Sequence, residues 1–532
     1  MKEAEAKKYN FKPVVLIILD GFGISPDKYG SPWEVTDHPT FTEIEKFYPF
    51  TTLQASGIAV GLPWGKEGNS EVGHLAIGAG KTILNFLPKI SSAIEDGSFF
   101  KNEAFLGAVN YVKTNGSNLN IMGVFSSGTV HAYSEHLYAL LDLAQKEGAP
   151  NVNLHLFTDG KDAFHKEGAE YFKKLEADLL AKYPNVKIAT VIGRRFAMDR
   201  SENWPWIKQS YETLTIGGVE KYKSASEFIA QNYAKDIFDE EMTPGILDTG
   251  DTNSRIKDND AVIFYNFRED SAREITHAFV EENFNKFERK KLQNLFFVTM
   301  TEYEKGLPVH VAFPSAEVEW PLARVIAEAG KKQMHIAETQ KYAHITYFLN
   351  GGKEEEFPGE DRVLIPSPKI SSYDLEPEMS ARQITEKVLE SMGKYDFIAV
   401  NFANADMVGH TGNFAATAKA FAVIDECVGR ILPRVLDLGG VVVITADHGN
   451  AEEKLYKTTG QEKTQHSINP VPCHLIANEF KYKESQSDEV IKKKYKEVSG
   501  IITDVAPTLL ELMNLQKPTQ MTGRSLLKEL LK

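Results

Sequence analysis

An α/β fold, with a central and mostly parallel sheet and a second α/β unit, is the class that this sequence predicts. Two apolar runs rich in β-branched residues carry the prediction: Val14-Val-Leu-Ile-Ile-Leu19 and Val441-Val-Val-Ile444. Such runs are typical of strands buried on both faces, as in a parallel sheet. Each run is soon followed by a carboxylate, Asp20 or Asp447, and a glycine. We therefore expect one sheet that is assembled from both ends of the chain.

Length and charge limit the classes of protein that remain. A chain of 532 residues, 42% of them hydrophobic, can bury a sizeable core and is too long for one ordinary domain. The formal net charge of -14 argues against a nucleic-acid partner and against sustained contact with an anionic membrane. The first 13 residues are charged, and no run approaches the ~20 apolar residues of a membrane helix. We expect a cytoplasmic protein.

The middle of the chain, from about residue 85 to 316, predicts the second α/β unit. An amphipathic stretch, Gly168–Lys182, separates two of its candidate strands, which is the alternation typical of βαβ units. The candidate strands are Leu119–Ser126, Val152–Thr158, Lys187–Gly193, Ala261–Phe267 and Leu295–Thr301.

Polar residues follow these middle strands. Each alone is more often part of a surface ion pair than a ligand contact. Because they gather at strand ends, they predict a pocket for a small anion that carries hydroxyl groups. They are His131, Asp159, Lys161, Asp162, Arg194, Asp199, Arg200, Arg268 and Asp270.

The outer segments offer groups suited to metal binding. Asp447 and His448 form a mixed oxygen and nitrogen pair for a divalent transition metal, although a helix-capping Asp447 is the alternative. Ser70 is expected at or near a helix start, where anions are favoured. It could become phosphorylated if a metal lowers the pKa of its hydroxyl, or it could be an ordinary N-cap.

A second group lies between those segments. Asp406 and His410 are four residues apart, which places both on one face of a helical turn, with a plain surface contact as the alternative. Together the outer segments supply seven oxygen and nitrogen groups, enough for two metal ions, and a hydroxyl among them points to phosphoryl transfer through a covalent intermediate. The seven are Asp20, Ser70, Asp406, His410, Asp447, His448 and His466.

Several long motifs resemble those of one family, in order and over nearly the whole chain. They are Gly-Asn-Ser-Glu-Val-Gly-His at 68–74, Ala-Glu-Thr-Gln-Lys-Tyr-Ala-His at 337–344, Asp-Met-Val-Gly-His-Thr-Gly at 406–412 and Thr-Ala-Asp-His-Gly-Asn-Ala-Glu at 445–452. This pattern closely resembles the cofactor-independent (2,3-bisphosphoglycerate-independent) phosphoglycerate mutases of the alkaline phosphatase superfamily.

The resemblance implies an alkaline-phosphatase-like domain formed by residues 1–84 and 317–532, with a transferase domain, 85–316, inserted between. It implies a monomeric isomerase of glycolysis and gluconeogenesis that interconverts 3-phosphoglycerate and 2-phosphoglycerate. Two divalent ions, manganese with zinc or cobalt as alternatives, would be bound at two sites. One site comprises Asp20, Ser70, Asp447 and His448, and the other comprises Asp406, His410 and His466.

The resemblance also assigns the substrate contacts. Ser70 would become phosphoserine and Lys341 would neutralise the phosphate. The glycerate would be held by His131, Lys161, Asp162, Arg194, Arg200 and Arg268. Where the family usually has Asp, Gly, Arg and Arg, this chain has Ser127, Thr129, Lys161 and Ser271.

These departures motivate an alternative function, a metal-dependent phosphohydrolase or a mutase of another small phosphate ester. A catalytically silent binding protein is a third reading. It would be expected to have lost metal ligands, and all seven are present.

Overall fold

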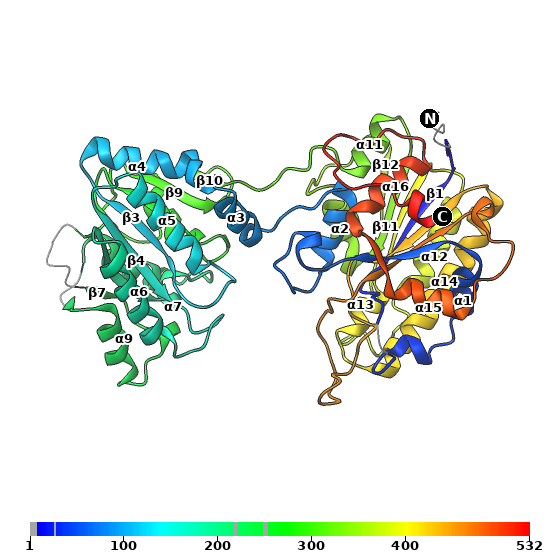
Figure 1. The fold of residues 1–532 in the computed structure, drawn as a ribbon, viewed down its shortest axis with the longest axis horizontal. Helices are drawn as coiled ribbons and strands as arrows, with labels where there is room; N and C mark the ends of the chain where they lie inside the picture. Colours follow the sequence, from blue (N-terminus) through cyan, green and yellow to red (C-terminus); the bar gives the residue numbers. More distant parts are fainter. Residues whose placement is uncertain (1–7, 26–27, 218–220, 248–253) are drawn as a thin grey trace. The chain divides into compact units, whose positions relative to one another are not determined.

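The computed structural model describes residues 8–25, 28–217, 221–247 and 254–532. Contacts divide the chain into two compact units, Met1–Asn85 with Ala316–Lys532 (unit 1) and Phe86–Ser315 (unit 2) (Figure 1). Each unit has its own sheet and its own hydrophobic core. The predicted α/β class is therefore confirmed.

Unit 1 contains an eight-stranded sheet in the order β12-β11-β13-β1-β14-β15-β2-β16. β1 pairs in parallel with β13 and β14, so the N-terminal strand lies between two strands from the far end of the chain, as predicted. Among the described strands of this sheet, only β15 runs antiparallel to its neighbours. The strands are β1 (Val14–Leu19), β2 (Phe50–Gln54), β11 (Gln333–Glu338), β12 (Glu360–Ile365), β13 (Phe397–Phe402), β14 (Val441–Thr445), β15 (Val471–Ile476) and β16 (Val498–Ile501).

Helices of unit 1 pack into two groups. α2 contacts α11 and α16, whereas α14 contacts α1, α12 and α13. Cys427 is buried within α14. The helices are α1 (Pro39–Phe47), α2 (Ser70–Ala79), α11 (Leu322–Glu328), α12 (Ala381–Ser391), α13 (Asn404–Gly409), α14 (Phe414–Asp437), α15 (Asp488–Lys496), α16 (Val505–Leu512) and α17 (Leu527–Leu530).

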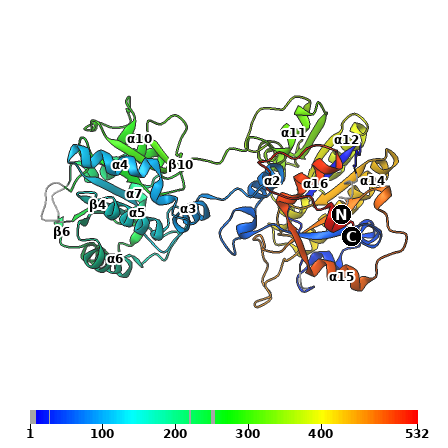
Figure 2. The same cartoon turned by 45° about the horizontal axis from the view of Figure 1, so that its top comes forward.

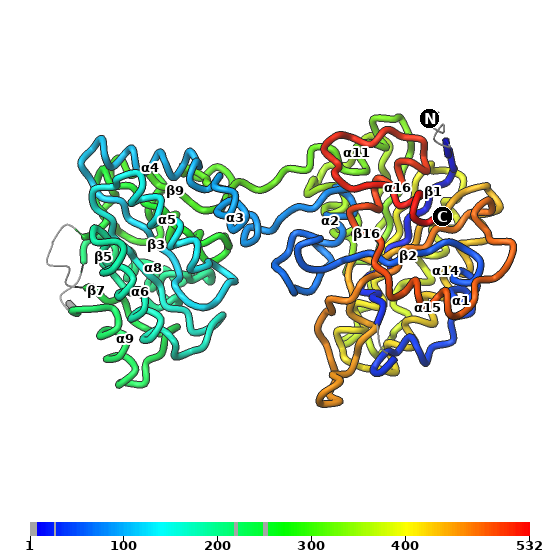
Figure 3. Tube along the Cα trace, viewed as in Figure 1, coloured from blue at the N-terminus to red at the C-terminus, as the bar shows by residue number. Residues whose placement is uncertain are grey.

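Shorter helical turns complete unit 1. The π-helix η6 (His344–Phe348) contacts α2. The backbone N–H of Phe11 donates to the carbonyl of Leu512 (3.1 Å), so the N-terminal segment lies beside the end of α16 (Figure 3). The 3-10 turns are η1 (Pro32–Val35), η2 (Gly57–Val60), η5 (Thr339–Lys341), η7 (Asn478–Phe480) and η8 (Ile502–Asp504).

Unit 2 contains the second eight-stranded sheet, in the order β10-β9-β8-β3-β4-β5-β7-β6, with parallel pairing except between β5 and β7. The predicted strands are present, four of them with one end shifted by one to three residues. The strands are β3 (Leu119–Val124), β4 (Val152–Thr158), β5 (Val186–Gly193), β6 (Lys221–Tyr222), β7 (Gly245–Leu247), β8 (Ala261–Phe264), β9 (Phe296–Thr301) and β10 (His310–Phe313).

Helices flank the sheet of unit 2 (Figure 2). Lys89 Nζ donates to the carbonyl of Pro314 (2.6 Å), so the two ends of this unit lie close together. The helices and turns are α3 (Phe86–Glu95), η3 (Phe99–Lys101), α4 (Glu103–Asn115), α5 (Ser134–Lys146), α6 (Gly168–Lys182), α7 (Arg194–Ala197), α8 (Trp204–Thr215), α9 (Ala225–Tyr233), η4 (Asp239–Glu241) and α10 (Arg273–Val280). Among the described residues of the whole chain, we find no helix with the length and apolarity needed to cross a bilayer.

Candidate active site

The first group of polar residues lies at the carboxyl ends of the central strands of unit 1. β1 and β14 are parallel neighbours, with Ile18 opposite Thr445. Asp20 and Asp447 each follow two residues later, so both carboxylates emerge at the same edge of the sheet, where open α/β sheets bind ligands. Ser70 is the first residue of α2, whose N-cap is Asn69. Ser70 is therefore not the capping residue.

Asp447 does not cap a helix either. Its Oδ1 accepts hydrogen bonds from the backbone N–H groups of Gly21 (3.1 Å) and His448 (3.0 Å). Its buried Oδ2 has no hydrogen-bond partner of good geometry. His74 Nδ1 lies 3.2 Å from this oxygen, but it is closer to the carbonyl of Ser70 (2.8 Å). The free lone pairs of Oδ2 are available to a cation.

Ser70 joins these groups through its hydroxyl. Ser70 Oγ lies 3.1 Å from Asp20 Oδ1 and 3.0 Å from His448 Nε2. His448 Nε2 in turn lies 3.6 Å from Asp20 Oδ1 and 3.5 Å from Asp447 Oδ2. Asp20, Asp447 and His448 thus form a cluster with the spacing needed to hold one metal ion.

A second cluster adjoins the first. Asp406 and His410 lie one helical turn apart at α13, as the spacing predicts, with His410 Nε2 3.3 Å from Asp406 Oδ1. His466 Nε2 lies 3.3 Å from the same oxygen and 3.0 Å from His410 Nε2. His448 Nε2 is 4.0 Å from Asp406 Oδ1. All seven predicted groups therefore converge on one region of unit 1.

The hydrogen bonds of the second cluster show that it fits a cation. His410 Nδ1 lies 2.9 Å from the carbonyl of Thr464, and His466 Nδ1 lies 2.7 Å from that of Gly68. A carbonyl only accepts, so the proton of each neutral ring is on Nδ1. Two Nε2 lone pairs then face each other and the Asp406 carboxylate. A divalent transition metal suits this donor set, and carbonyl-bound Nδ1 atoms are typical of metal-bound histidines.

Lys341 connects the two clusters. Its ammonium lies 2.6 Å from Asp20 Oδ1, 2.6 Å from Asp406 Oδ2 and 2.7 Å from Ser70 Oγ. Burial lowers the pKa of Lys341, but the Asp20 and Asp406 carboxylates outweigh burial and raise it, so the side chain stays charged. Burial raises the pKa of Asp406, but the Lys341 ammonium and the bonds from the two histidines bring it well below its usual value.

Burial, followed by the nearby Asp447 carboxylate, raises the pKa of Asp20. The site thus concentrates negative charge in a buried volume that one ammonium only partly compensates. This imbalance is a further reason to expect bound cations.

Some residues at this site were missed by the sequence reasoning. Asn401, the fifth residue of β13, donates from Nδ2 to Asp20 Oδ2 (2.8 Å) and to His74 Nε2 (3.0 Å). Asn450 Nδ2 donates to Asp406 Oδ1 (2.8 Å). His74 offered a signal, because it lies four residues after Ser70 on the same face of α2. Asn401 offered none.

In unit 2 a cavity of about 230 Å³ collects the predicted substrate residues. All six that belong to this unit line it: His131, Lys161, Asp162, Arg194, Arg200 and Arg268. Of the four positions that depart from the family pattern, Lys161 and Ser271 line the cavity, and Ser127 and Thr129 do not.

Arg194 is a buried residue in the lining of this cavity. Its Nη1 donates to Asp159 (2.6 Å) and Asp162 (2.5 Å), and its Nη2 lies 2.9 Å from His131 Nε2. His131 Nε2 is therefore an acceptor. Burial, followed by the charge of Arg194, lowers the pKa of His131 to about 4, so its ring is neutral at neutral pH.

Arg200 and Arg268 converge on one carboxylate. Asp270 Oδ2 lies 2.5 Å from Arg200 Nη1 and 3.0 Å from Arg268 Nη2. Ser271 donates to the other oxygen of Asp270 from its N–H (2.8 Å) and its Oγ (3.2 Å). Arg273 Nε donates instead to the carbonyl of Tyr303 (2.8 Å), and Arg273 does not line the cavity.

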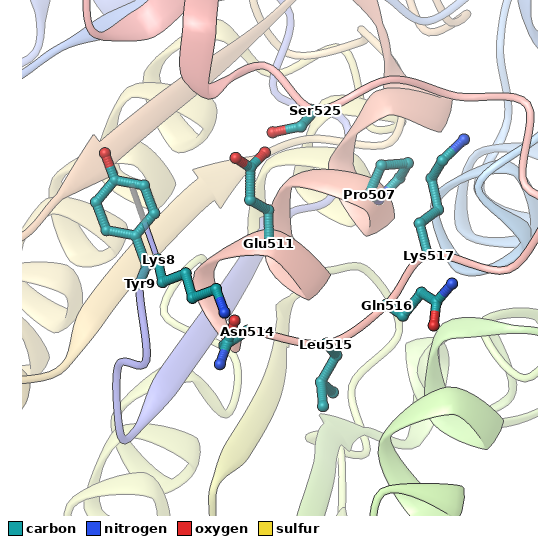
Figure 4. A pocket seen from close by; sticks show the side chains of 9 residues that line it. All are labelled: Lys8, Tyr9, Pro507, Glu511, Asn514, Leu515, Gln516, Lys517 and Ser525. Carbon is teal, nitrogen blue, oxygen red and sulfur yellow. The ribbon is translucent and has the colours of Figure 1, made fainter. Parts of the chain in front are cut away.

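A separate cavity of about 480 Å³ lies in unit 1. Figure 4 shows Tyr9 and Lys8 on one side of it and residues in and after α16, such as Glu511, on the other. None of the predicted site residues lines it.

The relatives of this chain agree with the chemistry of both clusters. A family model described as the Metalloenzyme superfamily matches residues 12–517. The 2,3-bisphosphoglycerate-independent phosphoglycerate mutase of Chloroflexus aggregans is 47% identical over 97% of this chain and 98% of its own length. The chain belongs to this mutase family. The 2,3-bisphosphoglycerate-independent phosphoglycerate mutase 1 of Methanosarcina barkeri is 46% identical over 97% of this chain and 98% of its own length.

A solved mutase shares the fold. The crystal structure of Leishmania mexicana phosphoglycerate mutase at low cobalt concentration is 28% identical, with a TM-score of 0.59 and 98% of each chain covered. Membership makes this chain an isomerase and implies divalent metal ions. It does not favour the phosphohydrolase alternative.

Proposed function

We propose that this mutase interconverts 3-phosphoglycerate and 2-phosphoglycerate through phosphoserine at Ser70, without 2,3-bisphosphoglycerate. The observation that supports this role best is the environment of Ser70 Oγ. It lies within 3.1 Å of Asp20, His448 and the Lys341 ammonium, at the start of α2. The free N–H groups there favour a phosphate.

Manganese is the ion we propose, with zinc or cobalt as alternatives that the same donors accept. When bound, the two ions would favour the serine alkoxide and neutralise the charge of the phosphoryl oxygens. One ion would be held by Asp20, Ser70, Asp447 and His448, and the other by Asp406, His410 and His466.

The residues of the chain supply the remaining steps. Ser70 Oγ gives up its proton and bonds to phosphorus as the bond to the 3-oxygen of the substrate breaks, and that oxygen takes up one proton, so glycerate leaves as an alcohol. The Lys341 ammonium donates to the phosphoryl group. The 2-hydroxyl of the retained glycerate then gives up its proton and attacks phosphorus, the bond from phosphorus to Ser70 Oγ breaks, and Oγ takes up one proton.

Retention of glycerate is the task we propose for the cavity of unit 2. The guanidinium groups of Arg194, Arg200 and Arg268 would bind the carboxylate, and Asp162 and His131 would bind the hydroxyls. In this proposal unit 1 is the alkaline-phosphatase-like domain and unit 2 the transferase domain of a cytoplasmic monomer.

An enolase-coupled assay with 3-phosphoglycerate, run without 2,3-bisphosphoglycerate, tests the proposal. We expect activity to disappear with a chelator and to return with manganese. A phosphate-release assay runs beside it. Release of phosphate faster than isomerisation would replace the mutase with a phosphohydrolase.

A further inference from the structure

One arginine of the unit 2 cavity has no role in the scheme above. Arg195 lines the cavity beside Arg194, and the two are consecutive residues of α7. Arg194 is buried and already contacts Asp159, Asp162 and His131. Consecutive helical residues point in different directions, so Arg195 is free of that network.

Arg195 and Lys161 belong to the same wall. A Cβ on Gly160 would lie 2.7 Å from the backbone nitrogen of Glu240, and a Cβ on Gly193 would lie 2.7 Å from its carbonyl oxygen. Both turns thus pack closely against Glu240, which also lines the cavity. Lys161 follows Gly160 directly, and Arg195, two residues after Gly193, contacts Glu241 of η4, so both cations reach the cavity beside η4.

The ion pair that Arg195 makes with Glu241 can readily be replaced by a contact with a bound carboxylate. Arg195 Nη2 lies 2.7 Å from Glu241 Oε1, and the two side chains are 36% and 47% exposed. An ion pair as exposed as this contributes little stability. By contrast, Arg200 and Arg268 are tied to Asp270, so part of their charge is already neutralised.

We propose that Arg195 binds the carboxylate of phosphoglycerate and determines specificity for it. Its guanidinium supplies the two-pronged grip that Lys161, a point charge, and Ser271, an uncharged side chain, lack. This inference rests on the proposed function and adds a residue to it.

The test is Arg195→Gln. Because a charge-assisted contact is lost, KM for 3-phosphoglycerate should rise roughly ten- to hundredfold with kcat within about twofold. Glycerol 3-phosphate has the phosphate but no carboxylate, so its inhibition constant should not change. Arg273→Gln is the matched control, and it should change neither KM for 3-phosphoglycerate nor the inhibition constant of glycerol 3-phosphate. Glu241→Gln, which releases Arg195, should leave KM equal or lower.

Calorimetry measures the affinity of wild type and Arg195→Gln for 3-phosphoglycerate without turnover. If the wild-type protein proved inactive, the mutase proposal would be refuted, but the role of Arg195 in binding the carboxylate could still be tested. The inference is overturned if Arg195→Gln changes neither KM nor affinity by more than about threefold. It is also overturned if the variant weakens both compounds equally. Should that variant fail to fold, Arg195→Lys, which keeps the charge but not the fork, must itself raise KM several-fold.

Discussion

At the scale of single residues, the hydroxyl of Ser70 contacts Asp20 and His448 of the first cluster and the Lys341 ammonium. We expect Ser70→Ala to reduce mutase activity below about a thousandth of wild type, because no other hydroxyl occupies this position. The other six ligands remain, so metal analysis should still find at least one ion per chain. Substantial residual turnover would mean that a different group carries the phosphate.

Proton competition at the histidine ligands is the second residue-scale prediction. Burial lowers the pKa of His466, but its contact with Asp406 outweighs burial and raises it in the metal-free protein. A protonated ring cannot bind metal, so affinity for manganese falls as pH drops through this raised pKa. Activity at limiting manganese should therefore decline from about neutral pH downward.

Adding manganese should offset that decline, since mass action favours the metal-bound form. The measurement is activity between pH 6 and 8 at limiting and saturating manganese. An activity at pH 6 that does not respond to the metal would contradict this account.

At the scale of elements, the close packing of α2 against the loop after β14 sets the position of Ser70. A Cβ on Gly73 would lie 2.6 Å from the carbonyl oxygen of Asp447. Gly73→Ala should therefore push the helix away from that loop and lower activity about tenfold or more, although no ligand is changed. Glu71→Ala, an exposed change in the same turn, is the control and should keep activity. Equal activities of the two variants would show that α2 tolerates the shift.

Much of the element scale could be predicted from sequence, because buried parallel strands and amphipathic helices have strong local patterns. β4 and α6 have the predicted bounds. Asp20 and Asp447 were found because they follow buried strands, and Ser70 because it begins a helix. Asn401 could not be found, since within a buried strand an amide that positions Asp20 resembles any satisfied polar group. Ser271 was noted only as a lost arginine, whereas its hydroxyl fixes Asp270.

At the scale of the whole molecule, the two cores are separate, and the ends of unit 2 lie close together at Lys89 and Pro314. We expect a fragment of residues 86–315 to fold alone, with a cooperative thermal transition followed by circular dichroism. A fragment of residues 316–532 is the control and should not fold, because it lacks β1 between β13 and β14. A disordered 86–315 fragment would show that unit 2 depends on unit 1.

The position of β1 also has a consequence for synthesis on the ribosome. Its parallel partner β13 begins about 380 residues later in the chain. At roughly 5–20 residues per second, translation of that stretch takes about 20–80 seconds. Throughout this interval an entirely apolar strand has no partner and is a target for chaperones. Asp20 and Asp447 can meet only after residue 447 has been translated, so a shorter nascent chain can neither assemble the first metal cluster nor act on substrate.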